Sequence, residues 1–441
     1  METDQRQNIS VQRERAILVG VELNGSASNA RESLKELHAL ADSAGAVVVA
    51  TFLQRRQRLD AKHYIGRGKV EELAQSVEQH DANVIIFNDD LSPAQLREIE
   101  AVCKCKVIDR SELILDIFAS RAQTHEARLQ VELAQLEYTA PRLRGMWTHL
   151  ERIAGAGGGT GAGAVGGIGT RGPGERQIEI DRRIVNRRVT MLKRQIAEID
   201  RRKVRQVQSR HEHFNVSLIG YTNAGKSTLM NALTDAGVTT EDRLFATLDT
   251  KTRRWKLGGA DHALLSDTVG FIQRLPHHLV ASFRATLEEA IHADLLLHVV
   301  DASAPAALAQ YHSVAGVLDE LECAGHHTMV LLNKIDAVED PAMVQVLRHQ
   351  LPDGLPISAK TGAGLPELVE RVRALVVGQT CRVTVRLQSD DGRAMAFIER
   401  HAEVLDRRWD NHAVEMDVII GSTVLTRLQE NHPTSQVLQC A

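Results

Sequence analysis

The chain of 441 residues is 43% hydrophobic and 25% charged, a composition typical of soluble globular proteins with roughly three domains. It contains no run of about eighteen apolar residues, which argues against a membrane span. The polar stretch 1–15 has no signal-peptide core and is expected to be disordered. The five scattered cysteines form neither a disulfide framework nor a Cys-x-x-Cys pair, so we expect a cytoplasmic protein.

The net charge of -4 conceals a basic segment. Residues 110–210 contain 19 Lys and Arg against 11 Asp and Glu, which gives +8, and the remainder of the chain is therefore -12. A single basic segment on an otherwise acidic chain predicts a polyanionic partner for that segment.

Residues 16–109 alternate apolar strands with amphipathic helices, a pattern that predicts a parallel sheet covered by helices. The predicted strands are 16–21, 47–52, 84–87 and 107–108. Asp89 and Asp90 follow the third strand, at a position where open sheets often bind ligands. Ser92 and Pro93 come directly after them and are typical of a helix start, which favours a capping turn over a ligand site.

Two predicted helices carry the basic segment, and their apolar residues recur at steps of three and four. We therefore expect an antiparallel hairpin, with a kink or break at Pro141. The apolar residues are Leu129, Leu133, Leu136, Ala140, Leu143, Trp147 and Leu150, then Val185, Val189, Leu192, Ile196 and Ile199. The second helix also carries Arg182, Arg183, Arg187 and Arg188. Acidic residues are too few to pair every arginine, which favours phosphate-backbone binding over a merely solvated face.

A glycine-rich tip, residues 153–176, joins the two helices. Its eleven glycines cannot hold a fixed conformation without a partner. We interpret residues 155–165 as a flexible linker. Residues 166–176 also contain Arg171 and Arg176, which favours a tip that orders against nucleic acid.

A predicted strand, 216–219, and a predicted helix, 229–233, flank the segment Gly220, Tyr221, Thr222, Asn223, Ala224, Gly225, Lys226, Ser227 and Thr228. Two glycines five apart, followed by Lys-Ser, are typical of a loop that cradles phosphates with backbone N–H groups and a helix N-terminus. Lys226 is expected to bind the outer phosphates, and the Ser227 hydroxyl to ligate Mg²⁺. The flanking strand and helix argue against a chance glycine loop.

Two further segments are expected to contact Mg²⁺ and the γ-phosphate. The first segment is Phe245, Ala246, Thr247, Leu248 and Asp249. Its Thr247 hydroxyl is expected to bind Mg²⁺, and the Thr247 N–H is expected to donate to the γ-phosphate. In the second, Asp267, Thr268, Val269 and Gly270, Asp267 is expected to hold a Mg²⁺-bound water and Gly270 to donate its N–H. Phe271 follows where many GTPases place a water-orienting Gln, so no catalytic residue is evident and hydrolysis is expected to be slow without a partner.

The last two motifs predict guanine specificity. They are Asn333, Lys334, Ile335 and Asp336, and then Ser358, Ala359 and Lys360. The Asp336 carboxylate is expected to accept hydrogen bonds from guanine N1–H and the exocyclic amine, a donor pair that adenine lacks. Asn333 and Lys334 would brace the loop and the base, and the Ala359 N–H would meet the guanine oxygen. A small-molecule kinase would share only the phosphate loop, so the order of motifs predicts GTP binding.

The C-terminal segment, 379–441, is predicted to form a small α/β domain, because apolar residues alternate over 383–387 and 414–420. The predicted fold class is therefore α/β. Its parts are an N-terminal parallel α/β domain at 16–109, a helical hairpin at 110–210, a Ras-like P-loop GTPase domain at 211–378 and this C-terminal domain. We expect a monomer.

These motifs resemble the HflX family of GTPases, which are related to translation factors. The resemblance covers roughly residues 15–375 and rests on segments 221–228, 245–249, 267–271, 64–71 (YIGRGKVE) and 169–175 (GTRGPGE). It implies binding to the large ribosomal subunit and the splitting of stalled or idle ribosomes under stress. GTP, GDP and Mg²⁺ are the implied ligands, with no DNA. The candidate rRNA contacts are the arginines of the tip and of the second helix named above, Arg171, Arg176, Arg182, Arg183, Arg187 and Arg188.

The chain departs from the family pattern in two places, the extra Gly/Ala tract 153–165 and Thr250, where the family usually has proline. Asn223 occupies the position at which related GTPases coordinate K⁺, so K⁺ is a candidate second cation. An alternative function is a switch GTPase that acts on a protease or on a membrane-associated complex, peripherally at the membrane. A non-enzymatic nucleotide sensor is disfavoured, because the expected phosphate and Mg²⁺ ligands are all present.

Overall fold

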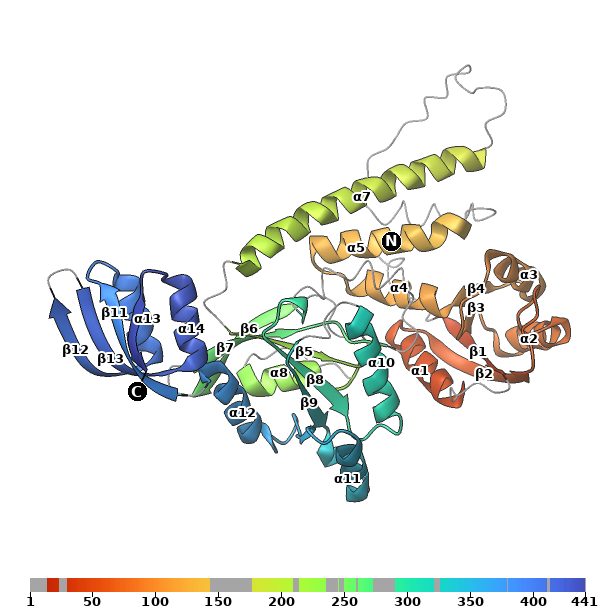
Figure 1. Ribbon diagram of the computed structural model, residues 1–441. Coiled ribbons are helices and arrows are strands. Elements are labelled where there is room, and N and C mark those ends of the chain that lie inside the picture. Colours follow the sequence, from red (N-terminus) through yellow and green to blue (C-terminus); the bar gives the residue numbers. More distant parts are fainter. Residues whose placement is uncertain are drawn as a thin grey trace, which may run out of the picture. The chain divides into compact units, whose positions relative to one another are not determined.

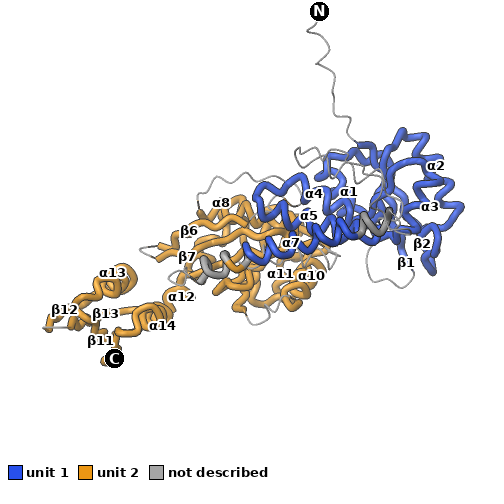
Figure 2. Tube along the Cα trace, turned by 90° about the horizontal axis from the view of Figure 1, so that it is seen from above, with its two compact units in different colours: residues 1–199, 275–283 blue, residues 200–274, 284–441 orange. Residues whose placement is uncertain are grey.

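The computed structural model describes residues 14–23, 30–142, 177–208, 214–234, 245, 250–258, 261–272, 290–320, 326–378, 380–410 and 413–440. The chain divides into two compact units, 1–199 with 275–283 and 200–274 with 284–441 (Figure 2). Within the described ranges, no helix combines the length and the apolar character needed to cross a membrane.

The first unit contains a four-stranded parallel sheet in the order β2-β1-β3-β4 (Figure 1). Its elements are β1 (Arg15–Leu23), α1 (Ala30–Ser43), β2 (Val47–Arg56), α2 (Arg67–His80), β3 (Val84–Phe87), α3 (Pro93–Cys103), β4 (Lys106–Asp109) and α4 (Arg110–Arg121). Ile17, Ile85 and Phe87 of the sheet are completely buried with Leu73 of α2 and Ile99 of α3. The predicted parallel α/β fold is confirmed.

Helix α3 begins at the predicted capping turn. The Ser92 hydroxyl accepts the Gln95 N–H at 3.3 Å, and the Gln95 side chain accepts the Ser92 N–H at 3.0 Å, which together form a capping box. Pro93 occupies the first turn, where its missing N–H costs nothing. The Ser111 hydroxyl donates to Asp90 Oδ1 at 2.5 Å, so Asp90 ties this turn to α4.

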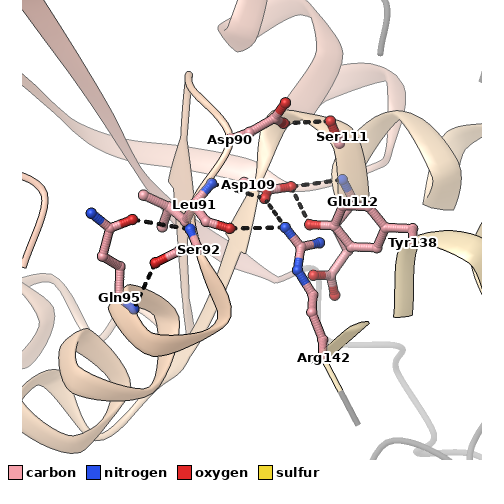
Figure 3. Close-up of polar contacts among 9 residues, drawn as sticks. All are labelled: Asp90, Leu91, Ser92, Gln95, Asp109, Ser111, Glu112, Tyr138 and Arg142. Carbon is pink, nitrogen blue, oxygen red and sulfur yellow. Dashed lines mark hydrogen bonds and ion pairs between the residues drawn. The ribbon is translucent and has the colours of Figure 1, made fainter. Parts of the chain in front are cut away.

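A buried network at the carboxyl end of the sheet fastens helix α5 (His125–Thr139) to that sheet (Figure 3). Asp109 is completely buried and accepts hydrogen bonds from Tyr138 Oη at 2.5 Å and from Arg142 Nη2 at 2.9 Å. The same Nη2 donates to Leu91 O at 2.9 Å, and the guanidinium lies 3.4 Å from the centre of the Tyr138 ring. A buried charge is costly unless it is paired, so these contacts fix the carboxyl end of α5 to the sheet. Burial also raises the pKa of nearby Glu112 to about 7.

Helices α5 (His125–Thr139) and α7 (Gln177–Gln208) lie side by side and antiparallel (Figure 1). Leu129, Leu133 and Leu136 of α5 form a buried cluster with Val185 and Leu192 of α7. Helix α5 ends at residue 139 and is followed by a 3-10 turn, η1 (Ala140–Arg142), so the predicted break at Pro141 is confirmed. The tip, 153–176, lies outside the described residues.

The second unit contains a six-stranded sheet in the order β10-β9-β8-β5-β7-β6, in which only the β6–β7 pair is antiparallel among the described strands. This part of the unit comprises β5 (Phe214–Gly220), α8 (Lys226–Thr234), β6 (Lys251–Gly258), β7 (Asp261–Asp267), β8 (Leu295–Asp301), α10 (Ala307–Glu320), β9 (Thr328–Asn333), η2 (Ile335–Ala337), α11 (Pro341–Gln350), β10 (Leu355–Pro356) and α12 (Leu365–Val377). Leu218, Leu297 and Leu331 from neighbouring strands are completely buried. The predicted motifs follow β5, β7, β9 and β10, whose carboxyl ends lie at one edge of this sheet.

The C-terminal domain is an antiparallel sheet in the order β12-β13-β11-β14, with the ferredoxin-like connectivity βαββαβ. Its elements are β11 (Thr380–Gln388), α13 (Gly392–His401), β12 (Glu403–Asp410), β13 (Ala413–Gly421), α14 (Ser422–Asn431) and β14 (Gln436–Cys440). A Cβ at Gly421 would lie 1.7 Å from Val377 O at the end of α12, so the close approach of the two segments requires glycine. The predicted α/β character of this tail is confirmed.

Candidate guanine-nucleotide site

The phosphate loop connects β5 to α8 and has an unusual backbone. Gly220, Asn223 and Gly225 have φ angles of 148°, 60° and 93°. A Cβ at Gly220 would lie 2.3 Å from Val299 O, and one at Gly225 would lie 2.4 Å from Asn333 Nδ2. Neither position has room for a side chain, so both need glycine, and the loop is fixed where its N–H groups can bind phosphates.

Lys226 is the first residue of α8 and is only 7% exposed. Its Nζ donates to Gly220 O at 3.1 Å and to Tyr221 O at 2.9 Å. Burial lowers the pKa of Lys226 to about 8, although the nearby Asp267 carboxylate favours the charged form. Burial, and next the proximity of Lys226, lowers the pKa of His298 to about 3, so this histidine is neutral at physiological pH. The hydrogen bonds that hold this buried ammonium go to uncharged carbonyl oxygens, so a phosphate anion beside it is expected to stabilise its charge.

Ser227 and Asp267 bring two oxygen donors together. Ser227 Oγ donates to Asp267 Oδ2 at 2.6 Å, and Asp267 ends β7 with 1% of its surface exposed. Hydroxyl and carboxylate oxygens are the ligands that Mg²⁺ prefers, so the donor set fits this ion. When bound, Mg²⁺ neutralises charge on the phosphates. Phe245 is buried, whereas Ala246, Thr247, Leu248 and Asp249 lie outside the described residues.

The segment that follows β7 pairs with the phosphate loop. The Thr222 N–H donates to Phe271 O at 2.7 Å, and the Phe271 N–H donates to Gly220 O at 3.1 Å. A Cβ at Gly270 would lie 2.8 Å from Thr222 Cα and 2.9 Å from Lys226 Nζ. Gly270 therefore lies against the loop, beside the Lys226 ammonium that is expected to bind the outermost phosphate.

The predicted guanine-binding residues come together at the ends of β9 and β10. Asn333 is 1% exposed; its Nδ2 donates to Ala224 O at 2.8 Å, and its Oδ1 accepts the Ala359 N–H at 3.0 Å. Ser358 Oγ donates to Asp336 Oδ1 at 2.6 Å. These hydrogen bonds join the phosphate loop to both guanine motifs, and they orient the carboxylate that is expected to meet the base.

Sequence alone does not single out two further residues, Asp301 and Ser303. Asp301 ends β8, and its carboxylate forms an ion pair with Lys334 Nζ at 2.7 Å. Ser303 donates two hydrogen bonds to the same carboxylate, from its N–H at 3.0 Å and from its hydroxyl at 2.6 Å. The one signal in the sequence is an aspartate at the end of a buried strand, next to the strand that carries the guanine motif.

Three of the described arginines of α7 differ in their exposure and surroundings. Arg183 and Arg187 are exposed. Arg188 instead donates from Nε and Nη2 to the Glu132 carboxylate of α5, at 2.6 and 2.7 Å, and this bidentate hydrogen bonding raises the pKa of Arg188. Arg188 therefore joins the two hairpin helices. The described residues do not include Arg171, Arg176 or the side chain of Arg182.

Comparison with known proteins identifies the family. Three family models match, described as GTP-binding GTPase N-terminal at 31–119, GTP-binding GTPase Middle Region at 121–210 and 50S ribosome-binding GTPase at 215–334. The chain is 41% identical to a GTPase HflX of Lacrimispora saccharolytica, with 95% of this chain and 96% of that relative covered. The chain belongs to the HflX family. The GTPase HflX of Magnetococcus marinus is 45% identical over 90% of each chain. Among solved structures, SsGBP in complex with GDP is 25% identical, with a TM-score of 0.47 over 82% of this chain and 98% of that chain.

This HflX-family chain binds guanine nucleotides and hydrolyses GTP. The geometry assigns separate tasks within that activity. Lys226 and the phosphate loop lie at the end of β5, where phosphates are expected to bind, and Ser358 holds the Asp336 carboxylate that is expected to meet the base. Phe271 has no side-chain group that can hydrogen-bond to the attacking water, so the water must be oriented by another group.

Proposed function

We propose that this chain is a GTP-switched factor that binds the large ribosomal subunit and splits stalled or idle ribosomes under stress, in the cytoplasm. The observation that carries this proposal is that one chain joins a guanine-nucleotide site to a basic helix, α7, with Arg183 and Arg187 exposed. The +8 charge of residues 110–210 and the family description, 50S ribosome-binding GTPase, support it. A regulator of a protease or membrane complex would use this helix to bind protein instead.

We propose a division of labour among the four domains predicted from the sequence. The hairpin, 110–210, binds rRNA, and its contacts include Arg171, Arg176, Arg182, Arg183 and Arg187. The GTPase domain, 211–378, decides by its nucleotide state whether that contact is made. We assign no part in this switch to the domains at 16–109 and 379–441.

We propose Mg²⁺ as the metal of the GTPase reaction, held by Ser227 and Thr247 directly and by Asp267 through water. We also propose that K⁺ binds beside the phosphates through Asn223, which is exposed and has a φ of 60°. Turnover measured in K⁺ and in Na⁺ at equal ionic strength tests the second point. Equal rates would contradict it.

We propose that the large subunit completes the hydrolytic site, because Phe271 cannot orient water. Groups supplied by a partner raise GTPase rates by about 10³–10⁵, so purified large subunits should stimulate turnover by well over tenfold. Replacing Arg187 of α7 by Ala should weaken this stimulation, whereas Arg348→Ala on the exposed face of α11 is the matched control and should leave it unchanged.

The salt dependence of the stimulation separates the two functions. Binding to rRNA phosphates should weaken steeply as salt rises, and Arg187→Ala should reduce the slope of that dependence by about one charge. A protein docking site would show a shallow slope. An absence of stimulation by large subunits at low salt would contradict the proposed function.

A further inference from the structure

Asp301 lies at the carboxyl end of β8, next to the loop that recognises guanine. Its carboxylate contacts Lys334 Nζ at 2.7 Å and accepts two hydrogen bonds from Ser303. The side chains of Asp301 and Lys334 are 15% and 29% exposed, so water screens this ion pair only in part. Asp301 is thus held in place by Ser303 as well as by the lysine.

The backbone brings the pair together without strain on the strand. Asp301 is paired with Asn333 in the parallel β8–β9 ladder, and the Ala302 N–H donates to Asn333 O at 2.8 Å. Lys334 then turns into the left-handed region, with a φ of 62°. Its Cε lies 3.9 Å from the position that a Cβ at Gly225 would occupy, so the lysine stem passes beside the phosphate loop.

We propose that Asp301 is a positioning residue for the guanine base. It fixes the ammonium of Lys334, and the aliphatic stem of that lysine is thereby held beside the phosphate loop as an apolar surface for the base. A free lysine side chain samples many rotamers, and a ligand that packs against it has to immobilise it. The ion pair with Asp301 immobilises the stem before the nucleotide arrives. This inference deepens the GTP-binding activity of the family, because it adds Asp301 and Ser303 to a recognition site that the motifs alone do not contain.

The positioning role makes a prediction about base specificity. Asp336 contacts the hydrogen-bonding edge of guanine, so its replacement should change the preference for GDP over IDP, which lacks the exocyclic amine. Asp301 acts through the apolar stem, which contacts the face of either base. Replacing Asp301 should therefore lower the affinities for GDP and for IDP by the same factor and leave the ratio of the two affinities unchanged.

The experiment compares equilibrium binding of GDP and IDP to the full chain and to Asp301→Asn, with melting temperatures measured in parallel. We expect both nucleotides to bind roughly tenfold more weakly, a factor equivalent to about 1.4 kcal/mol. Asp340→Asn, at the N-cap of α11, is the matched control and should bind both nucleotides as the native chain does. Ser303→Ala removes one of the two Ser303 hydrogen bonds to the carboxylate, and should lower the affinity for each nucleotide by about two- to threefold.

A second background tests whether Asp301 acts through Lys334. In Lys334→Met the stem remains but the charge is gone, so Asp301→Asn should have no further effect there. A tenfold loss that persists in Lys334→Met would overturn the proposal, as would a changed GDP/IDP ratio in Asp301→Asn. Should Asp301→Asn fail to fold, unchanged binding by the milder Ser303→Ala would count against the proposal. A failure of GTP binding altogether in the native chain would instead contradict the family activity and is distinguishable from all of these outcomes.

Discussion

Binding of GDP is predicted to take up a proton at alkaline pH because of Lys226. In the free protein, burial lowers the pKa of Lys226 to about 8, so the side chain is mostly neutral above that pH. The phosphates of a bound nucleotide place negative charge beside Nζ, which favours the ammonium and raises the pKa. The complex therefore binds more protons than the free protein does between these two pKa values.

The sign and size of the effect follow from this difference. Below pH 8, Lys226 is charged in both states, and its titration does not change the affinity for GDP. Above pH 8, the affinity falls by about tenfold per pH unit until the pKa of the complex is reached. The shift from the ordinary value of 10.5 to about 8 corresponds to about 3 kcal/mol, which is the largest loss expected if the phosphates restore the ordinary pKa.

Isothermal titration calorimetry at pH 9, in two buffers of different ionisation enthalpy, measures both quantities. The phosphates of GDP are fully ionised at this pH, so proton uptake comes mainly from the lysine, with a smaller share from guanine N1, which begins to lose its proton in this pH range. With a pKa of about 8 in the free protein, binding should take up about 0.9 proton, and the affinity should be about tenfold lower than at pH 7.5. Equal affinity at the two pH values, with no proton uptake, would refute the argument.

Three other predictions test separate parts of the structure. Folding raises the pKa of Glu112 from its ordinary value of 4.5 to about 7, so the native chain loses stability as the pH rises from about 4.5 to about 7. Glu112→Gln cannot ionise, so between pH 4 and pH 8 its stability relative to the native chain should rise by about 3 kcal/mol in urea titrations. If a bound γ-phosphate moves Gly270 away from the loop, the hydrogen bonds of the Thr222 and Phe271 amides should break. Hydrogen exchange of these two amides should then be slow without nucleotide and with GDP, and faster with a non-hydrolysable triphosphate; equally slow exchange in all three states would show that Gly270 does not move. Gly421→Ala should cost about 2 kcal/mol or more through overpacking, whereas Gly392→Ala, where a Cβ meets nothing within 4 Å, should cost little.

The sequence is informative about the site wherever the chemistry is local. The phosphate loop could be predicted because its glycines, Lys226 and Ser227 are consecutive, and their spacing alone places N–H groups and a helix N-terminus around a phosphate. The guanine motifs could be predicted for the same reason. The alternation of strands and helices likewise predicted the parallel sheet of the first unit, because parallel strands need helical crossovers between them.

The contacts that escaped prediction join residues far apart in the chain. Asp301 and Lys334 meet only because β8 and β9 are neighbours in the sheet, an order that strand patterns do not specify. Arg188 looked like its neighbours on α7, and only the packing against α5 shows that Glu132 takes its guanidinium. The network of Asp109 with Arg142 depends in the same way on how α5 meets the sheet, so periodicity alone could not reveal it.

Cosedimentation with purified large ribosomal subunits tests the central claim most directly. The claim is that the state of one guanine-nucleotide site governs whether the basic hairpin binds the ribosome. With a non-hydrolysable GTP analogue the protein should pellet with the subunits, and with GDP it should stay in the supernatant at the same salt concentration. Equal cosedimentation with the analogue and with GDP would contradict the account.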